Sequence, residues 1–182
     1  MNLSRFKFSI ALAFVFTGTI LMYSCAQTYV PSGMIEKEDY DRKLNRLLDH
    51  KVPVIGVDSL YNNMSEFTIL DARETVEWDV SKIPNATYVG YKDFEIDEID
   101  QKLNKEDKIV VYCSVGYRSE KITNKLKNAG YENVYNLYGS IFEWANRGYP
   151  LMAQDGDTTD RVHVYNKKWG QWMTNPDYQK IY

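Results

Sequence analysis

Histidine, cysteine and glycine-rich loops, which carry much metal and nucleotide chemistry, are scarce in this sequence. The 182 residues contain only two cysteines and two histidines, and His50 and His163 lie far apart in the chain. These four residues do not have the spacing that metal ligands have in known metal sites. Glycine-rich phosphate loops and nucleotide fingerprints are missing as well. We therefore expect the protein to use neither a metal nor an organic cofactor.

An excess of positive charge is also lacking. The chain carries 22 Lys and Arg against 25 Asp and Glu, a net charge of −3 at pH 7. This balance argues against nucleic acid as a partner, because phosphate binding requires a basic surface. The hydrophobic fraction of 44% is that of a folded globular protein, and 182 residues provide for one domain with short flanking segments. Repeats and low-complexity segments are absent.

Acidic residues are missing from the start of the chain as far as Glu36. Arg5 and Lys7 precede an apolar stretch over residues 8–22. This layout predicts a signal peptide for export over residues 1–24. The apolar stretch is short for a membrane-spanning helix, which needs about 20 residues. An uncleaved N-terminal anchor is the alternative.

The signal ends in residues 21–25 (LMYSC), which resemble the lipobox of bacterial lipoproteins. The resemblance implies cleavage before Cys25, acylation of that cysteine, and a lipid-anchored tether over residues 25–34. It also implies an exported membrane lipoprotein that faces the periplasm of a Gram-negative-type bacterium. Cleavage leaves 20 basic and 25 acidic residues, a net charge of −5. Membrane attachment then depends on the acyl chains of Cys25, because a basic patch is not available.

If Cys25 is acylated, Cys113 is a single thiol in an oxidising compartment. A leftover thiol in such a compartment indicates a function. The alternative is that Cys113 is a small buried hydrophobic residue, as free cysteines often are.

The spacing of apolar residues predicts an α/β domain that follows an amphipathic helix over residues 35–51. Apolar runs and helical periodicities then alternate, with strands expected at 54–57, 67–70, 86–89, 108–112 and 134–137, and helices at 74–80, 119–129 and 141–146. This alternation indicates a mostly parallel central sheet with helices on both faces. Cys113 follows a predicted buried strand, at the carboxyl edge where such sheets bind ligands.

The last segment, residues 151–182, departs from the α/β pattern and is rich in aromatic residues. These are Tyr165, Trp169, Trp172, Tyr178 and Tyr182. We expect a C-terminal strap that packs on the domain, because so many aromatic side chains are costly to expose. A tail that docks a partner is the alternative.

Residues 113–119 (CSVGYRS) join the predicted strand to the next helix. Such a loop turns its backbone N–H groups toward the Cys113 sulfur, with Gly116 free to adopt a positive φ. The helix N-terminus and the charge of Arg118 then lower the pKa of Cys113. A thiolate of this kind attacks a sulfane sulfur and holds it as a persulfide. Arg118 has a planar fork suited to an oxyanion of the donor, or to a salt bridge with a neighbouring carboxylate.

Several motifs of this sequence resemble those of the rhodanese family and follow one another in the same order as in that family. They are residues 70–73 (LDAR) with Glu77 and Trp78, residues 83–86 (IPNA), residues 113–119, and a closing pattern of Gly130, Tyr131, Val134, Leu137, Gly139, Trp144 and residues 148–150 (GYP). The resemblance covers residues 52–150 and implies a rhodanese-like fold for them. It implies that Cys113 is the catalytic residue and that its loop binds the substrate through Ser114, Val115, Gly116, Tyr117, Arg118 and Ser119.

The chain departs from the family pattern at residues 81–82, where Ser-Lys replaces Gly-His, and at Asn85 and Ser140, each of which replaces a glycine. We expect these departures to change local turn geometry without touching the loop that carries the sulfur. Asp71 and Arg73 are expected to form an ion pair that shapes the sheet edge beside that loop, and a catalytic role for them is the alternative. A local pair of Arg73 with Glu77 is also open.

The length of the loop distinguishes two chemistries on this fold. Rhodaneses have four residues between the cysteine and the arginine, as here, whereas related phosphatases and arsenate reductases have five. Rhodaneses that favour thiosulfate often carry an extra basic residue in this loop, so the resemblance implies that thiosulfate is a poor donor here, where Ser114 and Val115 are neutral.

The sequence thus predicts a sulfurtransferase that accepts a sulfane sulfur on Cys113. The expected donor is thiosulfate, polysulfide or a protein persulfide, and the expected acceptor is a thiol or another thiophilic group. A rhodanese-fold binding module without catalysis is the first alternative, and a phosphatase or arsenate reductase on the same fold is the second.

Overall fold

The computed structural model describes residues 33–182. The predicted signal peptide over residues 1–24, the predicted acylation site at Cys25 and most of the predicted tether lie outside the described residues. Among residues 33–182, no helix has both the length and the apolar character needed to cross a membrane.

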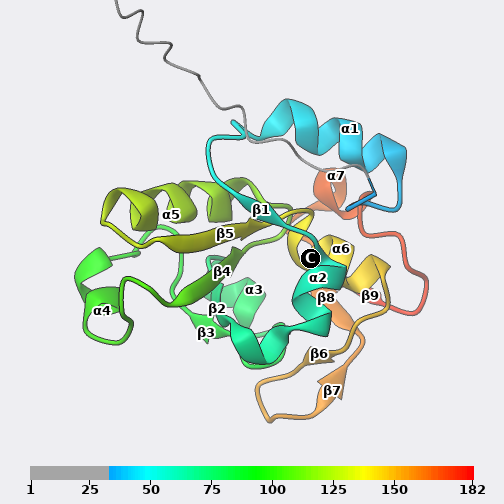
Figure 1. The fold of residues 1–182 in the computed structure, drawn as a ribbon. Coiled ribbons are helices and arrows are strands. Elements are labelled where there is room, and N and C mark those ends of the chain that lie inside the picture. The colour runs from blue at the N-terminus through cyan, green and yellow to red at the C-terminus, as the bar shows by residue number, and fades with distance from the viewer. Residues whose placement is uncertain (1–32) are drawn as a thin grey trace, which may run out of the picture.

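The centre of the molecule is a parallel sheet of five strands in the order β1-β5-β4-β2-β3 (Figure 1). The strands are β1 (Val54–Ile55), β2 (Thr68–Asp71), β3 (Thr87–Tyr88), β4 (Lys108–Tyr112) and β5 (Asn133–Leu137). The run KIVVY places β4 at the middle of the sheet, because only a strand with two covered faces accepts an uninterrupted apolar sequence. The prediction of a mostly parallel central sheet is confirmed.

Helices surround this sheet. They are α1 (Glu38–Leu47), α2 (Val57–Asn62), α3 (Thr75–Trp78), α4 (Ile96–Asp100), α5 (Tyr117–Asn128), α6 (Ser140–Asn146) and α7 (Lys167–Gly170), with a short 3₁₀ turn, η1 (Met64–Glu66). The helix predicted over residues 35–51 is observed as α1.

Alternate residues of the strands pack into two separate hydrophobic clusters, one on each face of the sheet. The first cluster contains Ile69, Val110 and Tyr112 from the strands, with Leu44, Leu60 and Trp144 from α1, α2 and α6. The second contains Leu70, Ile109 and Val111, with Ile99, Ile122 and Leu126 from α4 and α5. Helices therefore cover both faces, as predicted.

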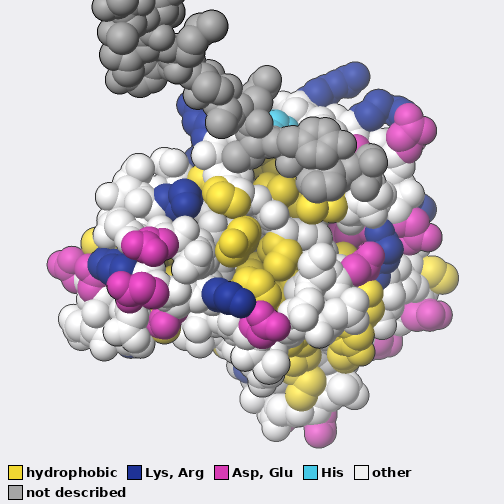
Figure 2. All heavy atoms as spheres, in the orientation of Figure 1, with side chains coloured by type: hydrophobic (Ala, Val, Ile, Leu, Met, Phe, Trp, Pro, Cys, Tyr) yellow, Lys and Arg dark blue, Asp and Glu magenta, His cyan; other side chains and the backbone are white. Residues whose placement is uncertain are grey.

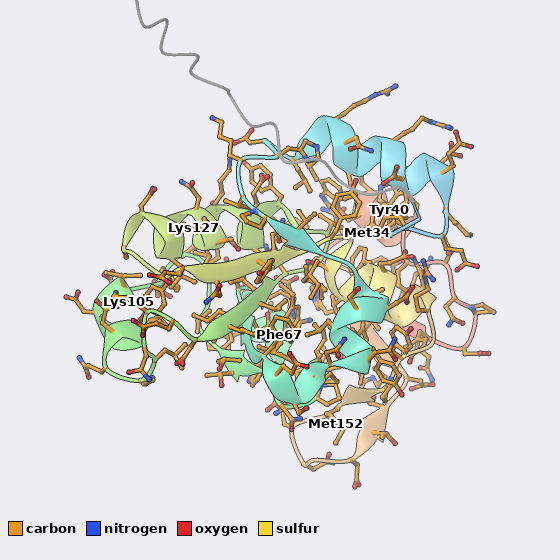
Figure 3. The ribbon with its side chains drawn as sticks, viewed as in Figure 1. Met34, Tyr40, Phe67, Lys105, Lys127 and Met152 are labelled. Carbon is orange, nitrogen blue, oxygen red and sulfur yellow. The ribbon has the colours of Figure 1, made fainter. Side chains whose placement is uncertain are left out.

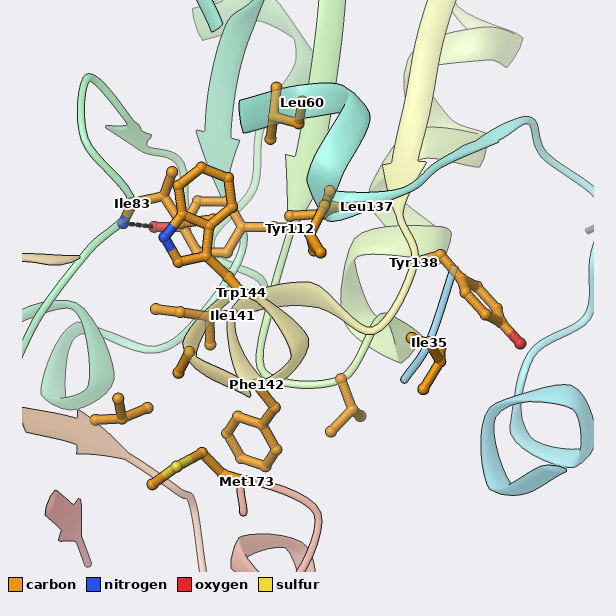
Figure 4. Packing of buried hydrophobic residues seen from close by; sticks show 14 of the residues in the cluster. Ile35, Leu60, Ile83, Tyr112, Leu137, Tyr138, Ile141, Phe142, Trp144 and Met173 are labelled. Atoms are coloured by element: carbon orange, nitrogen blue, oxygen red, sulfur yellow. Dashed lines mark hydrogen bonds between the residues drawn. The ribbon is translucent and has the colours of Figure 1, made fainter. Parts of the chain in front are cut away.

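Tyr112, the last residue of β4, links the first cluster to the polar edge of the sheet. Its ring lies beside Trp144 and Ile83 (Figure 4). Its hydroxyl accepts a hydrogen bond from the Ile83 backbone N–H at 3.2 Å and donates one to the Asp71 carboxylate at 2.5 Å. These two hydrogen bonds hold the end of β4, the residue just before Cys113, against β2 and against the turn that contains Ile83.

Some element boundaries differ from the prediction. Val57 begins α2 and does not end a strand, because Gly56 is the extended N-cap of that helix. Helix α5 begins at Tyr117, two residues early, because Gly116 already turns the chain with φ at +111°. Helix α4 was not predicted, since its short run of acidic and apolar residues has no clear periodicity.

The C-terminal segment adds two small pairs of strands. Strands β6 (Leu151–Met152) and β7 (Thr158–Thr159) are antiparallel, whereas β8 (Arg161–His163) and β9 (Gln179–Ile181) are parallel. Val162, Val164 and Met173 are fully buried in the first cluster. The segment therefore contributes to the core.

Helix α1 and the C-terminal segment also pack against each other. Tyr40 points from α1 toward the body of the molecule (Figure 3) and is fully buried. Its ring stacks on Trp172 at a centroid distance of 5.6 Å, and its hydroxyl donates to the Gly139 carbonyl at 3.0 Å. On the face shown in Figure 2, apolar side chains gather over β1 and α2, while most charged side chains lie toward the margins.

Candidate active site

Cys113 lies directly after β4, at the carboxyl edge of the sheet, with 1% of its surface exposed. Its sulfur accepts a hydrogen bond from the Gly116 backbone N–H at 3.1 Å, and the Ser119 hydroxyl oxygen lies 3.5 Å from it. Gly116 has the positive φ that the sequence predicted, which a residue with a Cβ rarely adopts. The loop thus curls around the sulfur and leads into the first turn of α5.

The pKa of Cys113 lies below its ordinary value. Burial raises this pKa, but the positive charge of Arg118 and the hydrogen bonds from Ser119 and Gly116 lower it by more. The predicted direction of the shift is therefore confirmed, and the thiolate is populated at a lower pH than that of a free cysteine.

Asn136, near the end of β5, holds the loop over residues 113–119 in place. The sequence analysis did not identify this residue. It is fully buried, its side-chain amide donates to the Gly116 carbonyl at 3.0 Å, and its side-chain oxygen accepts from the Ser119 hydroxyl at 2.6 Å. The contact depends on β5 lying beside β4, and no local pattern in the sequence reports that adjacency.

The start of α6 holds the backbone of Cys113 and Ser114. The N–H groups of Ile141 and Phe142 donate to the carbonyls of Cys113 and Ser114, both at 3.2 Å. These donors belong to the first turn of a helix, where no intrahelical acceptor exists. The Ser140 hydroxyl accepts from the Cys113 N–H at 3.0 Å and donates to the Leu137 carbonyl at 3.1 Å.

This contact corrects one expectation. Ser140 and Asn85 both have a positive φ, at +54° and +61°, which explains why glycine is common at these two family positions. Ser140, however, does not act on turn geometry alone, because its hydroxyl contacts the backbone N–H of Cys113.

Glu77 binds Arg118 and not Arg73. Its carboxylate accepts from the two terminal nitrogens of Arg118 at 2.6 and 2.8 Å, and from the Ser114 hydroxyl at 2.5 Å. The pKa of Glu77 is about 2, because these hydrogen bonds and the Arg118 charge outweigh the opposing effect of burial. The guanidinium of Arg118 therefore forms a salt bridge with a neighbouring carboxylate, which was one of the two roles that the sequence left open.

Local sequence explains how Glu77 is positioned. Glu74 is the N-cap of α3 and Glu77 is its third helical residue, so the two form a capping box. The Glu77 carboxylate accepts from the Glu74 N–H at 3.1 Å. One oxygen of the same carboxylate thus serves both the helix cap and Arg118.

Asp71 and Arg73 form the predicted ion pair. Both side chains are fully buried, and the Arg73 Nε lies 2.9 and 3.0 Å from the two carboxylate oxygens. The Arg73 Nη2 also donates to the Ser81 carbonyl at 2.5 Å. The pair joins the end of β2 to the following loop.

A cavity of about 390 Å³ opens above the loop. Cys113, Val115, Tyr117 and Arg118 form one side of its lining, and Leu47, Tyr91, Tyr165 and Trp169 contribute from elsewhere, with Glu74 and Lys92. The sequence showed that the last segment is rich in aromatic residues, but it did not show that two of them reach the site.

Neither histidine lines this cavity. His163 is buried, its Nδ1 accepts from the Tyr165 N–H at 3.1 Å, and burial lowers its pKa. Across residues 33–182, no three His, Cys, Asp or Glu side chains are grouped so as to hold a metal ion.

Comparison with protein families matches residues 56–147 to the rhodanese-like domain. Among curated proteins, a tRNA uridine(34) hydroxylase from Erwinia tasmaniensis is 35% identical over 88 residues, which are 45% of this chain and 25% of that protein. A probable adenylyltransferase/sulfurtransferase, MoeZ, from Mycobacterium tuberculosis is 24% identical over 154 residues, 75% of this chain and 39% of that protein. The chain thus spans well under half the length of these relatives.

Among solved structures, the rhodanese-like domain of an Anabaena sp. protein superposes with a TM-score of 0.52 at 27% identity. The alignment covers 56% of this chain and 79% of that domain. The predicted fold class is confirmed by this likeness together with the parallel sheet.

Proposed function

Because the chain belongs to the rhodanese-like domain family, we propose that it is a sulfurtransferase that carries a sulfane sulfur on Cys113. One observation carries the proposal: a buried thiol with a lowered pKa lies at the carboxyl edge of the sheet, within reach of two hydrogen-bond donors. The name of the Mycobacterium tuberculosis relative, which includes sulfurtransferase, agrees with it.

In the first step the Cys113 thiolate attacks the outer sulfur of the donor. A new S–S bond forms to Cys113, the S–S bond within the donor breaks, and the donor's remaining group leaves with the electron pair. The product is a persulfide anion, Cys–S–S⁻. The N–H groups of Tyr117 and Arg118 belong to the first turn of α5, where a helix has no internal acceptors, and we assign them to the terminal sulfur.

In the second step a thiolate or another thiophilic acceptor attacks the terminal sulfur. The S–S bond to Cys113 breaks and its electron pair returns to Cys113 as a thiolate. The donors that lower the pKa of Cys113 also stabilise it as the leaving group. The same contacts therefore favour both half-reactions.

Arg118 acts in this scheme mainly through its charge. Its terminal nitrogens are already bonded to Glu77, so its fork is not free to grip the oxygens of a donor. The loop supports phosphate transfer less well, because its four residues between Cys113 and Arg118 leave less room for a tetrahedral oxyanion than the five of the related phosphatases.

We also propose that the protein is exported and acylated at Cys25; these two expectations rest on the sequence alone.

The proposed activity is tested by sulfur transfer from polysulfide to cyanide, measured as thiocyanate. Wild-type protein should turn over, and Cys113→Ser should not. Equal turnover by the two proteins would refute the role of Cys113.

A further inference from the structure

The cavity above Cys113 has an aromatic wall that the family-matched residues do not supply. Tyr165 and Trp169 line it from the C-terminal segment, beyond the match that ends at residue 147. Tyr91 and Tyr117 add two more rings from within the matched domain. Any molecule that reaches the sulfur therefore passes along aromatic surfaces.

Both cations that line the cavity lie in ion pairs. Arg118 is bonded to Glu77, and its guanidinium lies 5.7 Å from the centre of the Tyr165 ring. Lys92 lies 3.7 Å from the Glu74 carboxylate. Among the lining residues that the structure describes, both cations have a carboxylate partner, which weakens their attraction for a small dianion such as thiosulfate.

The segment that carries the aromatic wall packs on the folded core: Trp169 is partly buried against the first cluster, whereas Tyr165 is 55% exposed. The Asn166 side chain caps α7 by accepting from the Trp169 N–H at 3.1 Å. Gly170 packs so tightly that an added Cβ would lie 2.9 Å from Val164, a fully buried residue. Trp169 is thus held in place by the helix that carries it.

Tyr165 is fixed by its backbone. Its φ is +63°, in the left-handed region that bulky residues rarely adopt. Its N–H donates to the buried His163 at 3.1 Å. A strained backbone at a residue that lines a cavity indicates a functional constraint.

We propose that this cavity binds the organic group of an aromatic sulfane-sulfur donor, and that Tyr165 and Trp169 set this preference. The inference rests on the proposed sulfur transfer at Cys113. The volume of about 390 Å³ lies within the range of small-molecule sites. Stacked or edge-on rings favour an aromatic substituent over an aliphatic one of the same charge.

Two probes with the same reacting group allow a test. Benzenethiosulfonate and methanethiosulfonate are both monoanions whose outer sulfur is attacked by the Cys113 thiolate. The S–S bond breaks, the sulfinate leaves with the electron pair, and Cys113 becomes a persulfide anion, so charge is conserved. Cyanide then removes the sulfur as thiocyanate and restores the thiolate. The ratio of kcat/KM for the two donors, divided by their rate ratio with a free thiol, measures recognition of the ring.

We expect the wild-type ratio to favour the benzene donor about tenfold, which corresponds to about 1.4 kcal/mol. Trp169→Ala and Tyr165→Gly should move the ratio toward one. Glycine suits the φ of Tyr165, so this second variant keeps the fold and decides the matter if Trp169→Ala does not fold. Tyr182→Ala, which removes an exposed ring of the same segment outside the cavity, should keep the wild-type ratio.

A wild-type ratio near one, with turnover intact, would overturn the inference and leave the proposed function standing. A high ratio that persists in both cavity variants would overturn the role of the two rings. If neither donor turns over and polysulfide does not load Cys113, the proposed function itself fails, and the inference fails with it.

Discussion

Glu77 holds both terminal nitrogens of Arg118, with the shorter contact at 2.6 Å, although the two residues are 41 positions apart in the chain. The Glu77 side chain is fully buried and that of Arg118 is 14% exposed. The pair ties α3 to the start of α5, beside Cys113. It therefore fixes the position of the charge that lowers the pKa of the thiol.

The pair predicts a specific loss of stability in acid. The pKa of Glu77 is about 2 in the folded protein against an ordinary 4.5, so the unfolded state binds more protons between these values. The stability that Glu77 contributes is thus complete above pH 4.5 and is lost as the pH falls toward 2, with a size on the order of 3 kcal/mol. Denaturant unfolding at a series of pH values should show this loss in wild-type protein.

The matched variants for this measurement are Glu77→Gln and Glu66→Gln. Glu77→Gln should lower stability at pH 7 and flatten the acid dependence, because it removes the titrating group. Glu66 makes an exposed pair with Lys108, so Glu66→Gln should keep the wild-type slope. The same acid slope in Glu77→Gln as in wild type would contradict the assignment.

Ser140 is predicted to support the nucleophile through its hydroxyl. Ser140→Ala removes the acceptor of the buried Cys113 N–H and should lower the free energy of unfolding by about 1–3 kcal/mol. Sulfur loading of Cys113 should slow as well. Ser140→Gly loses the same hydroxyl but suits the φ of +54°, so it should be the more stable of the two. Chemical denaturation of both variants checks the order, and the reverse order would count against it.

The sequence predicted those parts of the site that depend on near neighbours in the chain. Asp71 and Arg73 are two residues apart, and Gly116 lies within the loop that it bends, so their roles follow from local geometry. The apolar run of β4 likewise predicted a buried strand that ends at Cys113.

Contacts between distant segments were not predictable in this way. Asn136 reaches the loop only because β5 pairs with β4, and Glu77 reaches Arg118 only because α3 and α5 follow adjacent strands. Trp169 reaches the cavity because the C-terminal segment folds back over the carboxyl edge of the sheet. Each contact depends on strand order or on chain reversal, which residue spacing does not encode.

Arg118 should act on the reactivity of Cys113 through its charge. Arg118→Ala should raise the pKa of Cys113 and slow sulfur loading by about 10- to 100-fold, if about 1.4 to 2.8 kcal/mol of stabilisation is lost. Arg118→Lys should recover part of the rate, because it keeps the charge but not the two-point contact with Glu77. The pH dependence of Cys113 alkylation gives the pKa in each variant. An unchanged pKa in folded Arg118→Ala would show that the residue is structural only.

The proposed anchor predicts a defined start for the mature protein. Wild-type protein made in a Gram-negative host should begin at an acylated Cys25 and sediment with membranes. Cys25→Ala should block acylation and the cleavage that depends on it. Mass analysis of the N-terminal peptide gives the result, and a mature N-terminus at any other residue would contradict the proposal.

The central claim is that Cys113 carries sulfur, and the most direct test is the mass of the protein after incubation with polysulfide. We predict a gain of one sulfur atom, located on the peptide that contains Cys113 and reversed by cyanide. Cys113→Ser, whose oxygen is smaller but similar in shape, should fold and gain nothing at that peptide. A wild-type protein that stays at its original mass, or a gain that persists in folded Cys113→Ser, would contradict the account.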